Sequence, residues 1–442
     1  MPAMIRSGEA HHWSAPSDRS ATALVARRVG SAFLIEDRLD ATSEELAASL
    51  PAVPVSLVVA TTISGEDDVL RAVARFVSDV GVPVVRIVRM FAGTSITATW
   101  WQDLADRSGV ELIVSSGRVE LVGETMYTRG DGPGDVGSWL RCRPHRAIED
   151  IGPRHPVPLW HAAVLDRPES VGGVVARPVA AGVLLGDPDL APVHLAGAVA
   201  ADLERLTVVV EARCGIPVSA HDVAAFLARL PVAVRSEVRL VRIDGADVVA
   251  WGEAVACALG EDVTTVLGVP LASGAEERVV LLDPSGCRTW EPYLQEVRCH
   301  AVGSKGATGH RWRSPVPHLP ALGPGIAQVG EDWMLVTMSS GMWLRPARRF
   351  TEWTPTGAVS DPTIVVVAVG EPGLSLPDGV WLEVSAILDH LEPAVLRRVV
   401  VSVLGTVTEA GLAAVTEITA RRDIGLRVGR AARRTRPGTR AL

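Results

Sequence analysis

Three stretches of the chain repeat one order of apolar and helical segments, and this self-similarity limits the fold more than any other feature. The apolar run that begins at Leu57 recurs at Val208 and at Ile364. In each copy a helical pattern, a second apolar run, a second helical pattern and a third apolar run follow in that order. Matching segments lie about 150 residues apart between the first two copies and about 160 between the last two. Apolar runs aligned by chance would scatter more widely, so the sequence predicts a threefold repeat.

Each copy predicts a small α/β unit. Its apolar runs are four to six residues long and alternate with helical segments, which is typical of parallel strands joined by right-handed crossovers. We therefore expect an α/β protein of three repeated three-layer units, each a small parallel sheet with flanking helices and accessory β-hairpins. A hairpin opens every unit, and in the first two a further hairpin ends on Trp139 and Trp290, each 22 residues past a glycine.

The repeat sets the expected domain boundaries. The third unit stops after its third strand and lacks the closing hairpin, which leaves an edge or an apolar face uncovered. Either a terminal unit needs no cover, the interpretation we favour, or a partner supplies it. The expected segments are an N-terminal arm (1–19), repeat unit 1 (20–145), a linker (146–170), repeat unit 2 (171–300), a Gly/Pro-rich linker (301–330), repeat unit 3 (331–429) and a disordered arginine-rich tail (430–442).

Composition narrows the class of protein. A net charge of −8 argues against nucleic-acid binding except through the tail, and the abundance of Arg, Ala, Val, Gly and Pro indicates a GC-rich genome. The most apolar region, from Val171, is interrupted by Arg177 and Pro178, so no membrane span is expected. Without a visible Sec signal, and with five cysteines that lack CxxC spacing, a cytoplasmic protein with reduced thiols is the expectation.

The loops after the first strand of each unit are where a parallel sheet would bind a ligand. These loops share only a glycine and an acidic residue, which excludes a catalytic set repeated three times. Repeat unit 2 alone offers nucleophile chemistry, because a loop that folds back would bring Cys214 near His221, and a carboxylate would orient the imidazole. The weak candidates are Cys214, His221, Asp222 and Asp244. The simpler interpretation of His221 and Asp222 is a helix N-terminal cap.

Two other constellations were weighed as sites. Cys142 with His145, and Cys299 with His300 and His310, follow the closing hairpins of successive units, but a zinc site needs about four converging ligands, so no metal is expected. The loop GSKGATG, residues 303–309, holds the only lysine, Lys305. It misses the phosphate-loop pattern and precedes a proline-rich stretch that cannot begin a helix, so it predicts a flexible connector and no cofactor.

Three short motifs carry a family resemblance. They are GMWLRP closing a hairpin, ALG before a valine-rich strand, and the hairpin SGCRTWEPY. Together they resemble repeat modules of large actinobacterial proteins that neighbour polymorphic toxin domains. The resemblance implies a non-catalytic carrier or adaptor part and transfers no functional residue.

The leading hypothesis is a non-enzymatic scaffold in which three related α/β units present a composite surface to a protein partner. It depends on a shared core pattern combined with divergent loops. Homo-oligomerisation stays open. The first alternative is a hydrolase or transferase with its site near Cys214, His221 and Asp222, and the second is a nucleotide-binding regulatory protein that uses the strand-end crevice.

Overall fold

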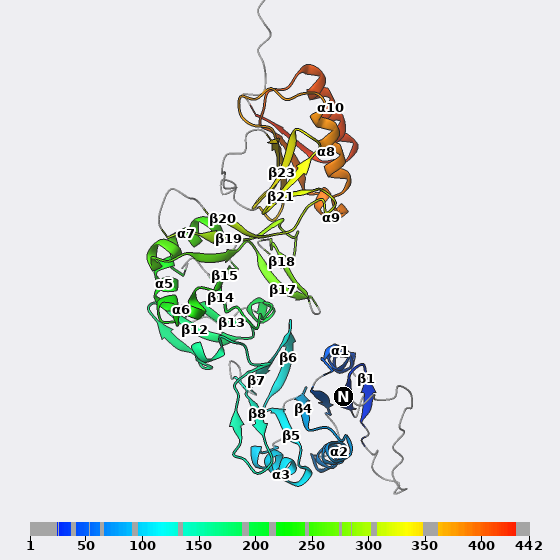
Figure 1. The fold of residues 1–442 in the computed structure, drawn as a ribbon, viewed down its shortest axis with the longest axis vertical. Helices are drawn as coiled ribbons and strands as arrows, with labels where there is room; N and C mark the ends of the chain where they lie inside the picture. The colour runs from blue at the N-terminus through cyan, green and yellow to red at the C-terminus, as the bar shows by residue number, and fades with distance from the viewer. Residues whose placement is uncertain are drawn as a thin grey trace, which may run out of the picture. The chain divides into compact units, whose positions relative to one another are not determined.

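Figure 1 shows the helices and strands of the computed structural model. It describes residues 24, 26–36, 41–52, 54–61, 66–90, 96–130, 136–187, 194–211, 218–243, 247–273, 276–283, 285–301, 307–347 and 361–429. The chain forms two compact units, which we call the first body (Met1–Leu121 with Thr125–Val157) and the second body (Val122–Glu124 with Pro158–Leu442). Both contain α-helices and mixed sheets with parallel strands, which confirms the predicted α/β class. Within the described residues no helix has the length and apolar character needed to cross a membrane.

The first body is built on a seven-stranded sheet. In spatial order its strands are β1 (Arg27–Val29), β2 (Ala32–Glu36), β3 (Val55–Ala60), β4 (Val84–Arg89), β5 (Glu111–Ser115), β8 (Trp139–Cys142) and β9 (Glu149–Asp150). Strands β2 to β5 run parallel, and β1, β8 and β9 add antiparallel strands at the edges. The valine-rich β3 and β4 are almost wholly buried, because parallel strands are covered on both faces.

Different elements cover the two faces of this sheet. On one face α2 (Glu66–Asp79) and α3 (Ala98–Ser108) contribute Val73 and Trp101 to the core. On the other face lie α1 (Ala41–Ser49) and a small sheet of β6 (Arg118–Val122), β7 (Thr125–Arg129) and β10 (Arg154–His155). The hairpin β6–β7 is therefore packed beside the main sheet. Strands β9 and β10 lie inside the segment 146–170, where the sequence predicts a linker.

The second body contains two large sheets. The strands of the first, in spatial order, are β11 (Glu169–Val171), β12 (Val174–Val179), β13 (Gly182–Gly186), β14 (Thr207–Val210), β15 (Arg239–Arg242), β16 (Val263–Val266), β19 (Leu294–Cys299) and β20 (Thr308–Trp312). Strands β13 to β16 run parallel, and the flanking strands pair antiparallel.

Helices again cover one face of this sheet and a hairpin covers the other. The elements α5 (Ala220–Ala228) and α7 (Val248–Leu259) bury Phe226 and Val255 in one core. The opposite core contains α4 (His194–Gly197) and the hairpin β17 (Val269–Ser273) with β18 (Glu276–Val280). The short η1 (His161–Ala163) precedes β11, and α6 (Val232–Arg235) precedes β15.

The second large sheet of this body has the strands β21 (Ala321–Gly323), β22 (Ile326–Val329), β23 (Trp333–Met338), β24 (Gly341–Pro346), β25 (Val365–Val369), β26 (Val399–Val403) and β27 (Gly425–Val428). Strands β24 to β27 run parallel, and a meander of antiparallel strands precedes them. Helices α8 (Val380–Asp389) and α10 (Glu409–Arg421) lie side by side on one face (Figure 1). A short α9 (Pro393–Leu396) leads into β26.

The segment 301–330 contains strands where the sequence predicts a linker. Strand β20 completes the first sheet of the second body, and β21 and β22 begin the second sheet. The two sheets also share a core, because Trp290 and Val316 pack with side chains of the second sheet and its helices. The indole Nε1 of Trp290 donates a hydrogen bond of 3.2 Å to the carbonyl oxygen of Asp361. Core packing and this hydrogen bond therefore join the two sheets.

Candidate functional site

Two of the four predicted catalytic residues lie in the described part of the chain. His221 is exposed in the first turn of α5, and Asp222 follows it. Cys214 and Asp244 lie outside the described residues, as does Lys305. The structure therefore leaves the proposed Cys–His pair a prediction.

Asp222 serves a structural purpose. Its carboxylate accepts hydrogen bonds from the hydroxyl of Ser219, at 2.5 Å, and from the backbone N–H of Gly173, at 3.2 Å. The Ser219 oxygen in turn accepts from the backbone N–H of Asp222, which caps α5. These bonds, led by the one from Ser219, hold the pKa of Asp222 below its usual value. Asp222 thus ties the start of α5 to the β11–β12 turn, and the N-cap residue is Ser219 rather than His221 or Asp222.

The cysteines weighed as metal ligands are buried thiols. Cys142 in β8 and Cys299 in β19 are fully buried, and burial raises the pKa of each to about 11. His300 contacts the Asp262 carboxylate at 2.9 Å and Thr308 at 3.1 Å. In the described residues no group of three or more His, Cys, Asp and Glu side chains is arranged to hold a metal ion.

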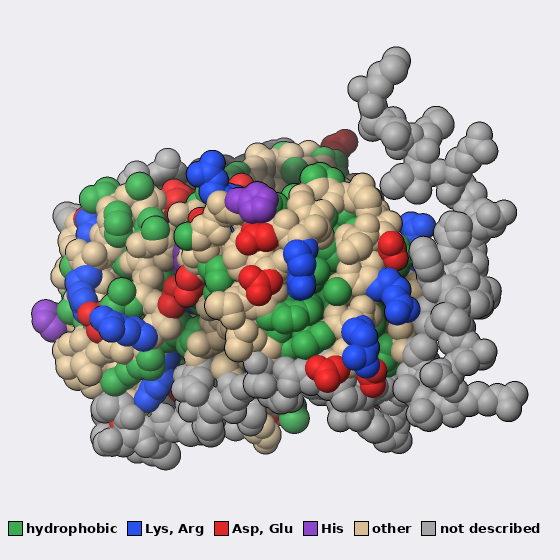
Figure 2. Space-filling model, turned by 90° about the horizontal axis from the view of Figure 1, so that it is seen from below, with side chains coloured by type: hydrophobic (Ala, Val, Ile, Leu, Met, Phe, Trp, Pro, Cys, Tyr) green, Lys and Arg blue, Asp and Glu red, His purple; other side chains and the backbone are tan. Residues whose placement is uncertain are grey.

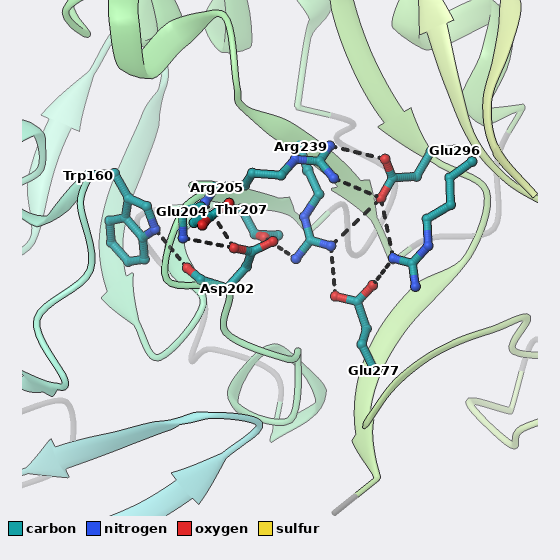
Figure 3. A network of polar contacts seen from close by, with 9 residues as sticks. Trp160, Asp202, Glu204, Arg205, Thr207, Arg239, Glu277 and Glu296 are labelled. Carbon is teal, nitrogen blue, oxygen red and sulfur yellow. Dashed lines mark hydrogen bonds and ion pairs between the residues drawn. The ribbon is translucent and has the colours of Figure 1, made fainter. Parts of the chain in front are cut away.

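A network of buried charges is the most polar feature of the second body (Figure 3). Glu296 in β19 accepts two hydrogen bonds from Arg205, at 3.0 and 3.3 Å, and Arg239 in β15 donates to Glu277 in β18 at 2.7 Å. Arg311 in β20 also pairs with Glu277, and it lies 3.7 Å from Glu296. The side chains of Arg239 and Glu296 are each only 1 % exposed. Because both charges are buried, each depends on the other members of the network.

This network links β14, β15 and β19 to one another and to the covering hairpin. Arg239 begins β15, and its guanidinium donates to the hydroxyl of Thr207, the first residue of β14, at 3.1 Å. Thr207 and Arg239 therefore lie at the amino ends of β14 and β15, whereas Glu296 lies opposite Val266, the last residue of β16. Glu277 comes from the covering hairpin, so its ion pairs hold that hairpin on the sheet face.

The first body has a buried arginine, Arg86, at the position that matches Arg239, but without partners like Glu277 and Glu296 among the described residues. Arg86 in β4 lies opposite Ser56 in β3, as Arg239 lies opposite Thr207, and it donates to the Ser56 hydroxyl at 2.6 and 3.0 Å. Arg86 is 1 % exposed, and burial lowers its pKa to about 10. Within the described residues no carboxylate forms an ion pair with it. Two neighbouring groups, the Trp139 indole Nε1 and the Nδ1 of His155, are also buried without a hydrogen-bond partner.

Trp139 and Trp290 do not occupy equivalent places, although their equal spacing predicts that they do. Trp139 is the first residue of β8, where it lies opposite Ser115. Trp290 precedes β19, and the residue of β19 that lies opposite Val266 is Glu296. The hairpin before β19 differs in length from the one before β8, so an equal count of residues does not give an equal place in the sheet.

A surface pocket of about 190 Å³ is the candidate binding site, and we call it the Arg229 pocket. It lies between β12, β13, the end of α5 and the segment that precedes β11. Its lining residues are Ala163, Val164, Leu165, Arg167, Glu169, Ala176, Arg177, Pro178, Val183, Phe226, Arg229 and Leu230. These residues come from separate segments and form no motif, so no sequence pattern indicates this pocket.

The chemistry of the Arg229 pocket is apolar with an excess of positive charge. Three arginines line it against one carboxylate, Glu169, which pairs with Arg229. Arg167 is exposed and makes no ion pair within the described residues. Leu165 is 48 % exposed at this site. Cofactor and substrate pockets usually measure roughly 300–1,000 Å³, so this pocket has room for one large side chain.

Elsewhere the described surface is mixed in charge. On the face shown in Figure 2, arginines and acidic side chains alternate with apolar ones, and over the described residues neither sign dominates. Such a face lacks the continuous basic surface that nucleic-acid backbones require. Neither the protein-family models nor the curated proteins searched give a match to this chain.

Proposed function

We propose that this protein is a non-enzymatic scaffold in which three related α/β units present a composite surface to a protein partner. The observation that carries the proposal is that the three large sheets share one order of strands, whereas the polar side chains at matching positions differ. Each large sheet has a hairpin that leads into four parallel strands, β2 to β5, β13 to β16 and β24 to β27. This common order supports the relation among residues 20–145, 171–300 and 331–429.

One glycine position supports the relation between the last two units. Gly182 and Gly341 both begin the first parallel strand, with φ angles of 149° and 143°. A Cβ on Gly182 would lie 2.3 Å from the carbonyl oxygen of Thr207, and one on Gly341 would lie 2.2 Å from that of Val366. The hairpin thus meets the parallel strand so closely that only glycine fits.

The polar groups at matching places differ. Ser56 opposite Arg86 matches Thr207 opposite Arg239, but the third sheet has Val366 opposite Val400. The units therefore share the arrangement of their core strands and not their polar side chains. Conservation of the fold without a common set of polar groups favours a scaffold. An enzyme would instead need chemically active groups that converge. Free thiols at the exposed Cys257 and Cys287 suit the cytoplasmic location that we propose with this function.

The Arg229 pocket is the part of the surface where we expect the partner to bind, and mutation of this pocket tests the proposal. Its size and charge suit a partner that inserts one apolar side chain beside an acidic residue, because buried anchors of this kind dominate protein interfaces. Leu165→Asp would place a carboxylate on the apolar side of the pocket. We expect it to weaken the partner complex about 10-fold or more.

The experiment is capture of the tagged chain from its native cells, followed by reconstitution with the purified partner and measurement of Kd. Leu382→Asp is the matched control, because Leu382 is 76 % exposed on α8, outside the pocket. Equal Kd values for both variants would remove the pocket from the interface. A purified protein that carries a stoichiometric small molecule and assembles with no protein would contradict the scaffold proposal itself.

A further inference from the structure

In the described part of the chain, the last strand of the third large sheet has one edge that no strand covers. Among the described residues β27 pairs only with β26, and so it ends the sheet. The matching strands in the other two large sheets, β5 and β16, each pair on that side with an antiparallel strand, β8 or β19. A free strand edge exposes unpaired backbone N–H and C=O groups and is a ready template for another strand.

The two internal examples define how a strand docks on this edge. Leu112 lies opposite Cys142 and Val114 opposite Leu140, and in the second case Val263 lies opposite Cys299 and Thr265 opposite Val297. The docking strands read WLRC at 139–142 and EVRC at 296–299. Both present an apolar residue, an arginine and a small residue in the same register.

An acidic residue recognises the arginine of the docking strand. Glu111 lies 3.3 Å from Arg141, and Asp262 lies 3.7 Å from Arg298. Each acid stands two residues before the residue that lies opposite the matching arginine: Ile113 lies opposite Arg86, and Thr264 lies opposite Arg239.

The third sheet keeps this acid. Gly425 pairs with β26, and Asp423 stands two residues before it. Asp423 is exposed, and no basic side chain of the described residues pairs with it. Asp423 lies just before β27 with φ of 51°, and its exposure leaves the carboxylate accessible to an arginine from outside the sheet.

The sequence of β27 itself fits the role of the docking strand. It reads GLRV, with Leu426 and Arg427 where the docking strands have Leu140 and Arg141, or Val297 and Arg298. We therefore infer that two copies of this chain form a dimer by antiparallel pairing of their β27 strands. The inference does not depend on the proposed scaffold function.

The register copied from the internal examples is symmetric when applied to β27. If Ile424 takes the place of Leu112, it lies opposite the partner's Val428, and Leu426 lies opposite the partner's Leu426. A two-fold axis then passes between the two Leu426 residues, as a closed dimer requires. Asp423 of each copy comes diagonal to the partner's Arg427, as Glu111 is diagonal to Arg141.

The backbone polarity of β27 agrees with this register. The N–H of Gly429 donates to the carbonyl oxygen of Val403, at 3.3 Å, so Gly429, Arg427 and Gly425 face β26. Since successive residues alternate, Leu426 and Val428 direct their N–H groups to the free edge. In the internal examples the residues at the place of Val428 donate to the docked strand at 2.8 Å, from Ser116 to Ser138 and from Leu267 to Gln295.

Burial gives a further reason for pairing. Leu112 and Val114 in β5 are fully buried, whereas Ile424 and Leu426 at the matching places are only partly buried against their core. A docked strand would cover them as β8 covers β5, and removal of apolar area from water favours the dimer.

The test measures the mass of the full chain by light scattering between about 1 and 100 µM. The natural chain is expected to dimerise in this range. Arg427→Glu and Asp423→Lys each place like charges together at both symmetric contacts, and each is expected to raise the dimer Kd about 10–100-fold. Arg397→Glu is the matched control, because Arg397 is exposed next to α9 and makes no ion pair in the described residues.

Mixing the two variants gives the sharpest outcome. A heterodimer of Arg427→Glu with Asp423→Lys has opposite charges at both contacts, so dimers should return at a 1:1 ratio. Val428→Pro should also give a monomer with unchanged circular dichroism, because it removes an N–H that does not pair with β26. A natural chain that stays monomeric at about 100 µM, or dimers that survive all three variants, would overturn the inference.

Discussion

Replacing Glu296 with glutamine is expected to lower the free energy of unfolding of the second body by about 3–5 kcal/mol, because the change leaves buried arginine charges without a partner. Glu296 is fully buried and holds Arg205 by two hydrogen bonds, with Arg239 at 3.7 Å. Arg239→Met should also lower this free energy, since it removes the 2.7 Å hydrogen bond to Glu277 and the 3.7 Å ion pair with the buried Glu296.

The same substitution in the first body should have the opposite sign or no effect. Arg86 occupies the matching place, but within the described residues it pairs only with uncharged groups, the Ser56 hydroxyl and the Pro51 carbonyl. Its burial already costs free energy that no carboxylate offsets. We therefore expect Arg86→Met to leave the stability of the first body unchanged or to raise it by about 1–2 kcal/mol.

Both changes are measured by guanidinium titration combined with hydrogen exchange of peptides from β3–β4 and β14–β15, so that each body is followed separately. Glu261→Gln is the matched control, because Glu261 forms an ion pair of 2.7 Å with Arg235 but is 44 % exposed. Its expected cost is below about 1 kcal/mol. If Arg86→Met and Arg239→Met lowered the free energy of unfolding of their bodies equally, the predicted difference between the two arginines would be wrong.

The stability of the first body is expected to fall by about 3 kcal/mol as pH decreases from about 6.5 to 4 because of one histidine. His155 is 8 % exposed and packs on Trp139 with ring centroids 5.2 Å apart. Burial, together with the charges of Arg86 and Arg141, lowers the pKa of His155 to about 4. The unfolded chain binds a proton near pH 6.5, so below that pH protonation favours the unfolded state. Above about pH 6.5 His155 is neutral in both the folded and the unfolded chain, so its protonation no longer lowers the free energy of unfolding.

His155→Leu removes the titrating group and should flatten this part of the pH profile, as measured by denaturant titration of the first body at several pH values. His310→Leu is the control, because His310 is exposed on β20 and makes no hydrogen bond in the described residues. Carboxylates also titrate in this range, so the difference between variant and natural chain is the informative quantity. Parallel profiles for His155→Leu and the natural protein would contradict the assignment.

Local pattern was enough to predict the α/β class and the parallel strands. Runs such as Leu57–Ala60 and Val208–Val210 are apolar without alternation, because a parallel strand is covered on both faces. A helix start near His221 and Asp222 was also predictable, but the N-cap residue is Ser219, whose hydroxyl accepts a hydrogen bond from the backbone N–H of Asp222.

The sequence by itself therefore determined the parallel strands and the helices between them, because apolar spacing and helix caps act over a few residues. Tertiary structure alone decided that β8 and β19 return beside β5 and β16, that 301–330 forms strands, and that the Arg229 pocket exists. It also decided which charges are paired, since Arg205 and Glu296 are 91 residues apart in the chain. Such contacts depend on which strands become neighbours, and that choice is made by the burial of whole sheet faces.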